Sequence, residues 1–398
     1  MKKSVLFVDD EPNILAGLKR MFRFLRHEMN VHFVESGEEA LAFIATEHVD
    51  IIVSDMRMPG MNGAALLAIV QERYPHIVRI MLSGQSNKEA ILRTMGVVHQ
   101  FLAKPISSEV FKEALARACA LQDLMQNIHV KSLISRVGNL PRLPAAYSEL
   151  QRILQDPECP LSDIADVITQ DLAMSAKVLQ LVNSSFFGFY KKIDSPDRAI
   201  NLLGIDIVKA LVLVVGIFNE LKPIAETSFS MQNLLEHSLG VAEFSRKIVQ
   251  EETDVKDEAD NAFLAGLVHD VGKLLLMSSI EREYAEVIRL AREQEMEFFQ
   301  AEQQTLNADH AAAGGYLMRT WGLPGQVVEA VAFHHRLDHY PEPSFCLAVA
   351  VHVADVFYHR FKPHAHGLPP ALNYPYLERA GLGDRLDHWQ ARCRKVEI

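Results

Sequence analysis

Residues 51–63 read IIVSDMRMPGMNG, an unbroken apolar run that ends at an aspartate and passes into a turn rich in Pro and Gly. A short apolar run without polar alternation is typical of a strand that is buried on both faces. A second such strand is expected at Arg79–Ser83, where three apolar residues stand in succession. Both strands therefore indicate a sheet that helices cover on each side.

Similar strands alternate with helices over the first third of the chain. The remaining strands are expected at Val5–Val8, Val31–Val34 and Gln100–Ala103. Amphipathic helical patterns lie between the strands at Ile14–Leu25, Glu38–Glu47, Ala64–Arg73 and Lys88–Met95. This alternation predicts an α/β, flavodoxin-like, doubly wound five-stranded parallel sheet, with its functional residues at the carboxyl ends of the strands.

Charged residues stand at those strand ends. Asp9 and Asp10 follow the first expected strand, and Asp55 follows the third. Carboxylates that share one edge of a sheet repel one another unless a cation neutralises them, and Mg²⁺ prefers oxygen ligands. Ser83 and Lys104 end the fourth and fifth strands, where a hydroxyl and an ammonium can hold a phosphoryl group on Asp55.

These residues resemble the receiver domain of two-component response regulators over residues 1–123. The matching motifs are Asp9-Asp10-Glu11-Pro12, Ser54 to Gly63, Ser83-Gly84 and Lys104-Pro105. The resemblance implies that Asp55 is the phosphoacceptor and that a sensor histidine kinase or a phosphotransfer protein is the partner. It also implies the Mg²⁺ ligands Asp9, Asp10, Asp55 and the backbone carbonyl of Arg57. Ser83 and Lys104 would contact the phosphoryl group, and Phe101 would be the switch aromatic.

A helix is expected to connect this domain to the rest of the chain. Residues 107–137 contain neither Gly nor Pro and overlap the last receiver helix. Within this segment, an apolar seam consists of Phe111, Ala114, Ala118, Leu121, Met125 and Ile128. Such a seam pairs two copies in a coiled-coil homodimer, or packs the helix against its own domain.

The second half of the chain reads almost entirely as helix. Residues 138–362 are expected to form an all-α output domain whose helices are separated by Pro and Gly, and residues 363–398 a tail with one short helix. Several histidines and aspartates in this half are candidate metal ligands: His237, His269, Asp270, His310, His334, His335 and Asp355. Imidazoles and carboxylates suit Fe, Mn or Zn, although histidines also serve as hydrogen-bonding core residues. Lys273 is a candidate phosphate contact.

The order of these residues resembles the HD superfamily of metal-dependent phosphohydrolases. The stretches at Leu140–Pro144, Asp171–Leu179, Val182–Gly188, Ala199–Gly204 and Trp321–Pro324 are similar to the HDOD domain. That resemblance implies a non-catalytic signalling module that binds a downstream signalling protein not identified by the sequence. The retained ligands leave an alternative, a metal-dependent phosphodiesterase for cyclic-di-GMP or a nucleotide. Arg336 stands where the active HD-GYP branch has a glutamate, which favours the non-catalytic module and leaves the phosphodiesterase as the alternative.

The composition excludes several other classes of protein. A formal net charge of −11 over 398 residues argues against direct DNA binding. The first apolar run ends at Asp9, and the longest, Ala210–Phe218, is too short to span a bilayer. The four cysteines are scattered. We therefore expect a cytoplasmic response regulator of a phosphorelay, in which phosphorylation of Asp55 controls the HDOD-like domain.

Overall fold

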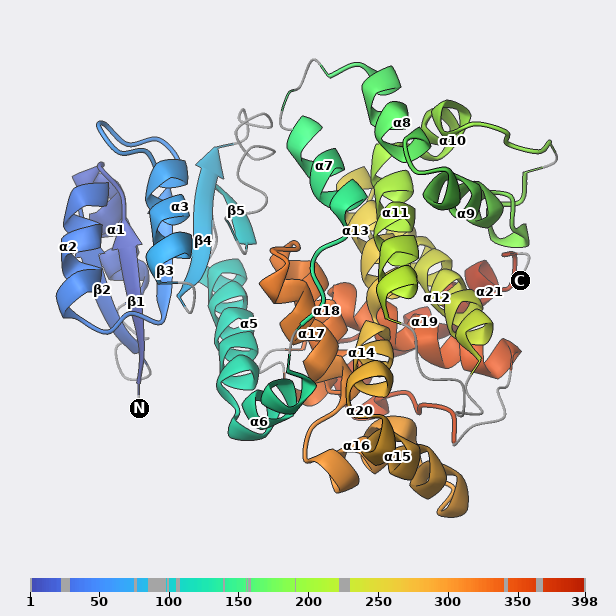
Figure 1. Cartoon of the computed structure of the whole chain (residues 1–398). Helices are drawn as coiled ribbons and strands as arrows, with labels where there is room; N and C mark the ends of the chain where they lie inside the picture. The colour runs from blue at the N-terminus through green and yellow to red at the C-terminus, as the bar shows by residue number, and fades with distance from the viewer. Residues whose placement is uncertain are drawn as a thin grey trace. The chain divides into compact units, whose positions relative to one another are not determined.

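The chain forms an α/β unit, which contains Met1–Leu124, and a helical unit, which contains most of the remaining residues (Figure 1). The computed structural model describes residues 2–22, 29–74, 77–84, 98, 100–104, 108–138, 140–154, 156, 159–189, 191–221, 230–339, 343–362 and 368–396. Each unit has its own core, and each is treated separately below.

The α/β unit is built on one parallel sheet with the strand order β2-β1-β3-β4-β5. Its strands are β1 (Lys3–Val8), β2 (Met29–Val34), β3 (Ile51–Asp55), β4 (Val78–Gly84) and β5 (Gln100–Lys104). The register pairs Val8 with both Val34 and Ser54, so neighbouring strands end at the same edge of the sheet. The predicted fold class, a receiver-like parallel α/β sheet followed by an all-α domain, is confirmed.

Helices cover both faces of the sheet. They are α1 (Pro12–Met21), α2 (Gly37–Thr46), α3 (Gly63–Arg73) and α5 (Ser108–Gln126). Alternate residues of β3 enter opposite cores: Ile51 and Val53 pack with α1 and α5, and Ile52 packs with α2 and α3. This alternation explains the continuous apolar runs of the sequence. The helix expected at Lys88–Met95 lies outside the described residues.

The connecting helix is broken, which corrects the prediction of one helix over residues 107–137. α5 ends at Gln126, and α6 (Ile128–Val137) begins after Asn127, whose side chain accepts a hydrogen bond from the His129 N–H at 2.8 Å. The cap side chain satisfies a helix-end donor and favours a new start at this point. Among the seam residues whose side chains the structure describes, only Ile128 is exposed. Phe111, Ala118 and Leu121 are buried, so dimerisation through this seam stays a prediction.

The helical unit contains α6 and two further groups of helices. The first group is α7 (Ala145–Ile153), α8 (Leu161–Thr169), α9 (Leu172–Val182), α10 (Pro196–Leu203) and α11 (Ile205–Glu220). The second is α12 (Met231–Glu252), α13 (Lys256–Val268), α14 (Val271–Ser279), α15 (Glu281–Glu293), α16 (Phe298–Leu306), α17 (His310–Thr320), α18 (Gly325–Phe333), α19 (Leu347–Phe361), α20 (Tyr374–Arg379) and α21 (Leu386–Cys393).

Close helix packing defines the centre of this unit. A Cβ at Gly240 would lie 1.9 Å from the ring of Tyr358, so glycine allows α12 and α19 to approach this closely. In the described part of the chain, Lys256–Ser279 is long and apolar enough to cross a membrane, but 83% of its apolar window is buried within the protein. Such burial is equally expected of a core helix in a globular domain.

The segment expected to be a tail is packed into the helical unit over its described residues. Trp389 and Cys393 on α21 are both 0% exposed. The Trp389 indole donates a hydrogen bond to Glu252 Oε1 at 3.0 Å, and the adjacent Glu251 pairs with His388 and Arg392. Apolar burial and ion pairs thus hold α21 against the end of α12.

Candidate functional site

The charged residues at the strand ends meet in one crevice of the α/β unit. Lys104 Nζ, at the end of β5, contacts Asp9 Oδ2 at 2.8 Å and also Asp55 Oδ1. One ammonium can reach both carboxylates only if they lie close together. Asp9 is 1% exposed, and Asp10 lies half-buried beside it in the chain.

The turn after β3 holds Asp55 in place. Asp55 Oδ2 accepts a hydrogen bond from the Arg57 N–H at 2.6 Å, and the Gly63 N–H donates to the Met56 carbonyl at 3.1 Å. A Cβ at Gly63 would lie 2.0 Å from the Asp55 carbonyl oxygen. Glycine is therefore required where α3 begins against the end of β3.

Electrostatics in this crevice favour a cation. Burial lowers the pKa of Lys104, but hydrogen bonds and charges from Asp55 and Asp9 outweigh burial and raise it above its ordinary value. The neighbouring carboxylates offer an oxygen donor set that fits Mg²⁺. The roles of Asp10 and of the Arg57 carbonyl stay predictions. The structure describes Ser83 and Phe101 as residues of β4 and β5 but not their side chains, so their roles also stay predictions.

A second site lies in the helical unit, where all the candidate metal ligands come together. Their ligand atoms form three groups, each within 4.8 Å: His237, His269 and Asp355; His269, Asp270 and His334; His310, His334 and His335. His269 and His334 each belong to two groups and so join them into one cluster. The ligands come from α12, the α13–α14 junction, the first residue of α17, the segment after α18, and α19.

Asp270 stands at the centre of the metal-ligand cluster. Its Oδ2 lies 3.4 Å from His269 Nε2 and 3.6 Å from His237 Nε2. Its Oδ1 lies 3.1 Å from His310 Nε2. The two oxygens of one carboxylate thus face different histidine groups, which is the arrangement of a bridging ligand between two ions.

Backbone carbonyls orient two of the imidazoles. His269 Nδ1 donates to the Gly266 carbonyl at 2.7 Å, and His334 Nδ1 donates to the Val331 carbonyl at 2.8 Å. Each Nε2 therefore presents a lone pair to the cluster, as in proteins whose histidines bind metal. Within the described residues, the buried Nε2 of His334 has no hydrogen-bond partner. A buried acceptor of this kind fits a metal ion.

Protonation states of most ligands in the cluster fit a metal ion, with His310 as the exception. Burial lowers the pKa of His310, but the charge of Glu302 and hydrogen bonds with Asp270 and Glu302 outweigh burial and raise it to about 9. Burial lowers the pKa of His237 to about 3, and burial with neighbouring imidazoles holds the pKa values of His334 and His335 well below normal. Burial raises the pKa of Asp270, but the charges of His269 and Lys273 outweigh burial and hold it well below its ordinary value. Neutral imidazoles beside an ionised carboxylate are the ligand forms that divalent metals bind.

Known families account for both units. The response regulator receiver domain family matches residues 5–116, and the HDOD domain family matches residues 140–337. The chain is a receiver domain fused to an HDOD domain. The crevice at Asp55 thus lies in the receiver domain, and the metal-ligand cluster lies largely within the HDOD match.

Individual relatives share only parts of this chain. An uncharacterized protein of Treponema pallidum is 28% identical over 211 residues, 53% of this chain and 40% of that protein. The hydrogenase transcriptional regulatory protein HoxA of Cupriavidus necator is 30% identical over 192 residues, 46% of this chain and 39% of that protein. The chain thus spans about two fifths of the length of these relatives. An HDOD domain protein of unknown function from Geobacter sulfurreducens shares the fold, with a TM-score of 0.54 at 24% identity over 67% of this chain and 97% of its own.

Two residues outside the predicted ligand set, Glu302 and His359, support ligands of the metal-ligand cluster. Glu302 Oε2 accepts from His310 Nδ1 at 2.6 Å, and its Oε1 accepts from the Tyr284 hydroxyl at 2.6 Å. His359 Nδ1 lies 3.0 Å from Asp355 Oδ1. The i, i+4 spacing of Asp355 and His359 on one helix was a usable signal. No local pattern connects Glu302 with His310, because these residues lie on different helices.

Two cations of the HDOD domain lie near the cluster in different ways. Lys273 Nζ donates to Asp270 Oδ2 at 2.7 Å, so its charge reaches the cluster, and its contact with a phosphate stays a prediction. Arg336 pairs with Asp309, which is 0% exposed. Because Asp309 neutralises this guanidinium, Arg336 opposes a bound cation less than its position in the sequence implied.

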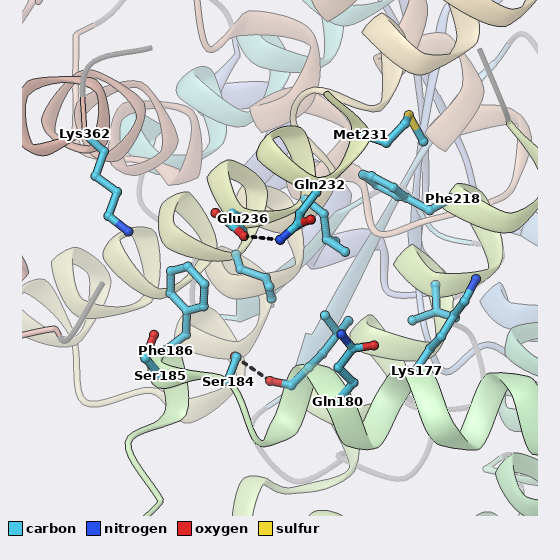
Figure 2. A pocket seen from close by; sticks show the side chains of 14 residues that line it. Lys177, Gln180, Ser184, Ser185, Phe186, Phe218, Met231, Gln232, Glu236 and Lys362 are labelled. Atoms are coloured by element: carbon cyan, nitrogen blue, oxygen red, sulfur yellow. Dashed lines mark hydrogen bonds between the residues drawn. The ribbon is translucent and has the colours of Figure 1, made fainter. Parts of the chain in front are cut away.

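A separate cavity of about 990 Å³ opens beside α12 in the HDOD domain (Figure 2). Its lining includes Glu236, the residue before His237, and two lysines, Lys177 and Lys362. None of the candidate metal ligands is among its described lining residues. His269, His310 and His334 are each 0% exposed, and His335 is the one half-buried ligand, so most of the metal-ligand cluster is buried.

Proposed function

We propose that this receiver–HDOD protein is a response regulator of a phosphorelay, in which phosphorylation of Asp55 controls the HDOD domain. The observation that carries the proposal is the contact of Lys104 with both Asp9 and Asp55. A phosphoryl group on Asp55 adds negative charge beside a cation that already lies within reach. A sensor histidine kinase or a phosphotransfer protein would supply the group, Mg²⁺ bound by Asp9, Asp10 and Asp55 would stabilise its charge, and Ser83 and Phe101 would respond to it.

The phosphoacceptor is tested by labelling the full chain with radioactive acetyl phosphate and Mg²⁺. We expect incorporation in the wild type and its loss in Asp55→Asn. Asp123→Asn is the matched control, because Asp123 is an exposed acid of the same domain whose side chain is 66% exposed. Undiminished labelling of Asp55→Asn, or labelling that survives removal of Mg²⁺ by EDTA, would contradict the assignment.

For the output, we propose an interaction module whose core holds a metal centre. The burial of every ligand except His335 favours a structural ion, because a substrate must reach the metal in order to react there. The HDOD domain would then present its surface to a downstream signalling protein. The receiver would change that surface according to the state of Asp55.

One observation favours a second candidate, a metal-dependent phosphohydrolase acting on cyclic-di-GMP or another nucleotide. The full ligand set is present, and Asp270 is placed to bridge two ions. Bound ions would supply an activated water and charge neutralisation at a phosphodiester. Lys273 is the residue of this chain that could hold the phosphate.

Metal analysis and a hydrolysis assay separate the two candidates. The protein is purified without added metal, its metal content is measured, and cyclic-di-GMP turnover is followed with Mn²⁺ or Fe²⁺. A wild-type protein that contains metal but does not hydrolyse cyclic-di-GMP supports the structural centre. If the wild type hydrolyses cyclic-di-GMP, Asp270→Asn abolishes this turnover, and Asp338→Asn on the nearby surface retains it, then the phosphohydrolase is the correct candidate. A wild type that binds no metal would exclude both.

A further inference from the structure

A second cavity of the helical unit, of about 680 Å³, carries an unusual charge pattern. It lies among α12, α21, the end of α10 and the turn at residues 183–189. Its described lining includes four cationic side chains, Arg246, Lys247, Arg392 and Lys395, and one carboxylate, Glu243. This cationic pocket stands out because the whole chain has a formal net charge of −11.

The carboxylate does not balance these cations. Glu243 Oε1 lies 3.0 Å from Arg246 and 3.4 Å from Lys247, so two cations share one acid. Arg392 is paired outside the pocket with Glu251. Like charges held together repel, and an anion that enters the pocket relieves that repulsion. Arg and Lys are also the side chains that proteins use to bind phosphate.

Aromatic rings line the same pocket. Phe186, Phe187 and Phe189 come from the turn at residues 183–189, which includes Gly188 in the left-handed conformation at φ +60°. The rings of Phe187 and Phe189 are nearly parallel, at 12°, with centroids 6.5 Å apart. Half-buried aromatic faces offer stacking surface to a planar base, an interaction that proteins use for every nucleobase.

The neighbouring cavity of about 990 Å³ has different chemistry. The two pockets share Ser184, Ser185 and Phe186. Figure 2 shows Lys177 and Lys362 at opposite ends of the larger cavity, with Glu236 between them. Its lysines therefore do not converge on one point, whereas Arg246 and Lys247 of the cationic pocket are neighbours on α12 and both contact Glu243.

We propose that the cationic pocket binds a nucleotide, with its phosphate against Arg246, Lys247 and Lys395 and its base against the phenylalanine rings. The volume lies within the range of small-molecule sites, roughly 300–1,000 Å³. The ligand would contact three segments at once: α12, the end of α21, and the turn of the HDOD sequence motif. This site is distinct from Asp55 and from the metal-ligand cluster, and it gives the HDOD domain a ligand input of its own.

The test is calorimetric titration of the full chain with 5′-GMP and 5′-AMP, with guanosine and inorganic phosphate as partial probes. We expect a saturable isotherm for at least one nucleotide and weaker binding of both partial probes. Inorganic phosphate that binds as tightly as the nucleotides would show a simple anion site and overturn the proposal, as would a wild type that binds neither nucleotide.

Paired variants locate the site. Lys247→Gln with Lys395→Gln should raise the nucleotide dissociation constant at least about tenfold, since each charge-assisted contact is lost. The matched double variant Lys177→Gln with Lys362→Gln removes the same charge from the larger cavity. It should change the nucleotide dissociation constant by less than about twofold. Equal weakening by both pairs would mean that the net charge of the chain, rather than this pocket, attracts the nucleotide.

Two further variants separate the base from the phosphate and this site from the metal-ligand cluster. Phe189→Leu should weaken nucleotide binding and leave the affinity for inorganic phosphate unchanged. Asp270→Asn should leave nucleotide binding intact, so that failure of the proposed metal centre and failure of this proposal give different results. Loss of binding in Asp270→Asn would place the nucleotide at the metal-ligand cluster instead. Thermal unfolding of each variant shows whether it is folded.

Discussion

At the scale of single residues, the receiver crevice depends on how closely side chains and backbone approach Asp55. Lys104 neutralises part of the charge of Asp9 and Asp55, and the backbone N–H of Arg57 fixes one oxygen of Asp55. Gly63 contributes through the absence of a side chain, since a Cβ there would overlap the Asp55 carbonyl. The placement of the phosphoacceptor thus depends on a residue that carries no functional group.

The variant Gly63→Ala should therefore lower both stability and labelling. The added methyl group must displace the backbone at Asp55, and overpacking of this kind costs about 1–3 kcal/mol. We expect a lower free energy of unfolding of the receiver domain in calorimetry, and weaker acetyl phosphate labelling. Gly17→Ala in α1 is the control, because a Cβ there meets no atom within 4 Å and alanine favours a helix by about 1 kcal/mol over glycine. Equal behaviour of the two variants would refute the steric argument.

At the scale of elements, the metal-ligand cluster depends on close contacts between helices. Asp270 precedes α14 and His310 begins α17, and these two helices meet at Gly272. A Cβ at Gly272 would lie 1.9 Å from the His310 carbonyl oxygen. The 3.1 Å separation between Asp270 Oδ1 and His310 Nε2 follows from that contact.

The variant Gly272→Ala should separate the two helices and weaken metal binding. Outer contacts that orient metal ligands typically change affinity by about 10–100-fold, and we expect a loss of bound metal within that range. The measurement is the metal content after dialysis against a graded chelator. Gly383→Ala, whose Cβ meets nothing within 4 Å, should retain the wild-type content. Full retention of metal by Gly272→Ala would show that the helix contact does not set the ligand geometry.

At the scale of the whole molecule, the chain consists of two units with separate cores and separate chemistry. The receiver core surrounds its sheet, and the HDOD core surrounds the buried histidines. Both tryptophans, Trp321 and Trp389, belong to the helical unit. Their indole N–H groups donate to Pro141 and Glu252, each at 3.0 Å, so both are sensitive to unfolding of that unit alone.

Unfolding should therefore separate the units. In urea titrations followed by tryptophan fluorescence, Gly272→Ala should lower the apparent stability. Gly63→Ala should leave it within about 0.5 kcal/mol of wild type, because Gly63 belongs to the other unit, which has a hydrophobic core of its own. Calorimetry detects both units. There the receiver transition should be destabilised by Gly63→Ala and unchanged by Gly272→Ala. A fluorescence transition that moves with Gly63→Ala would mean that the two units unfold together.

The sequence by itself determined the parallel α/β sheet, the helical character of the second half, and the residues at Asp9, Asp55 and Lys104. Sheet topology explains why these site residues could be predicted. In a parallel sheet the carboxyl ends of the strands share one edge, so a residue's place along its strand predicts its neighbours. Only the tertiary structure decided that the connecting helix breaks at Asn127, that Glu302 supports His310, and that the cluster closes around Asp270. These features depend on how helices distant in sequence pack, and local periodicity carries no information about that.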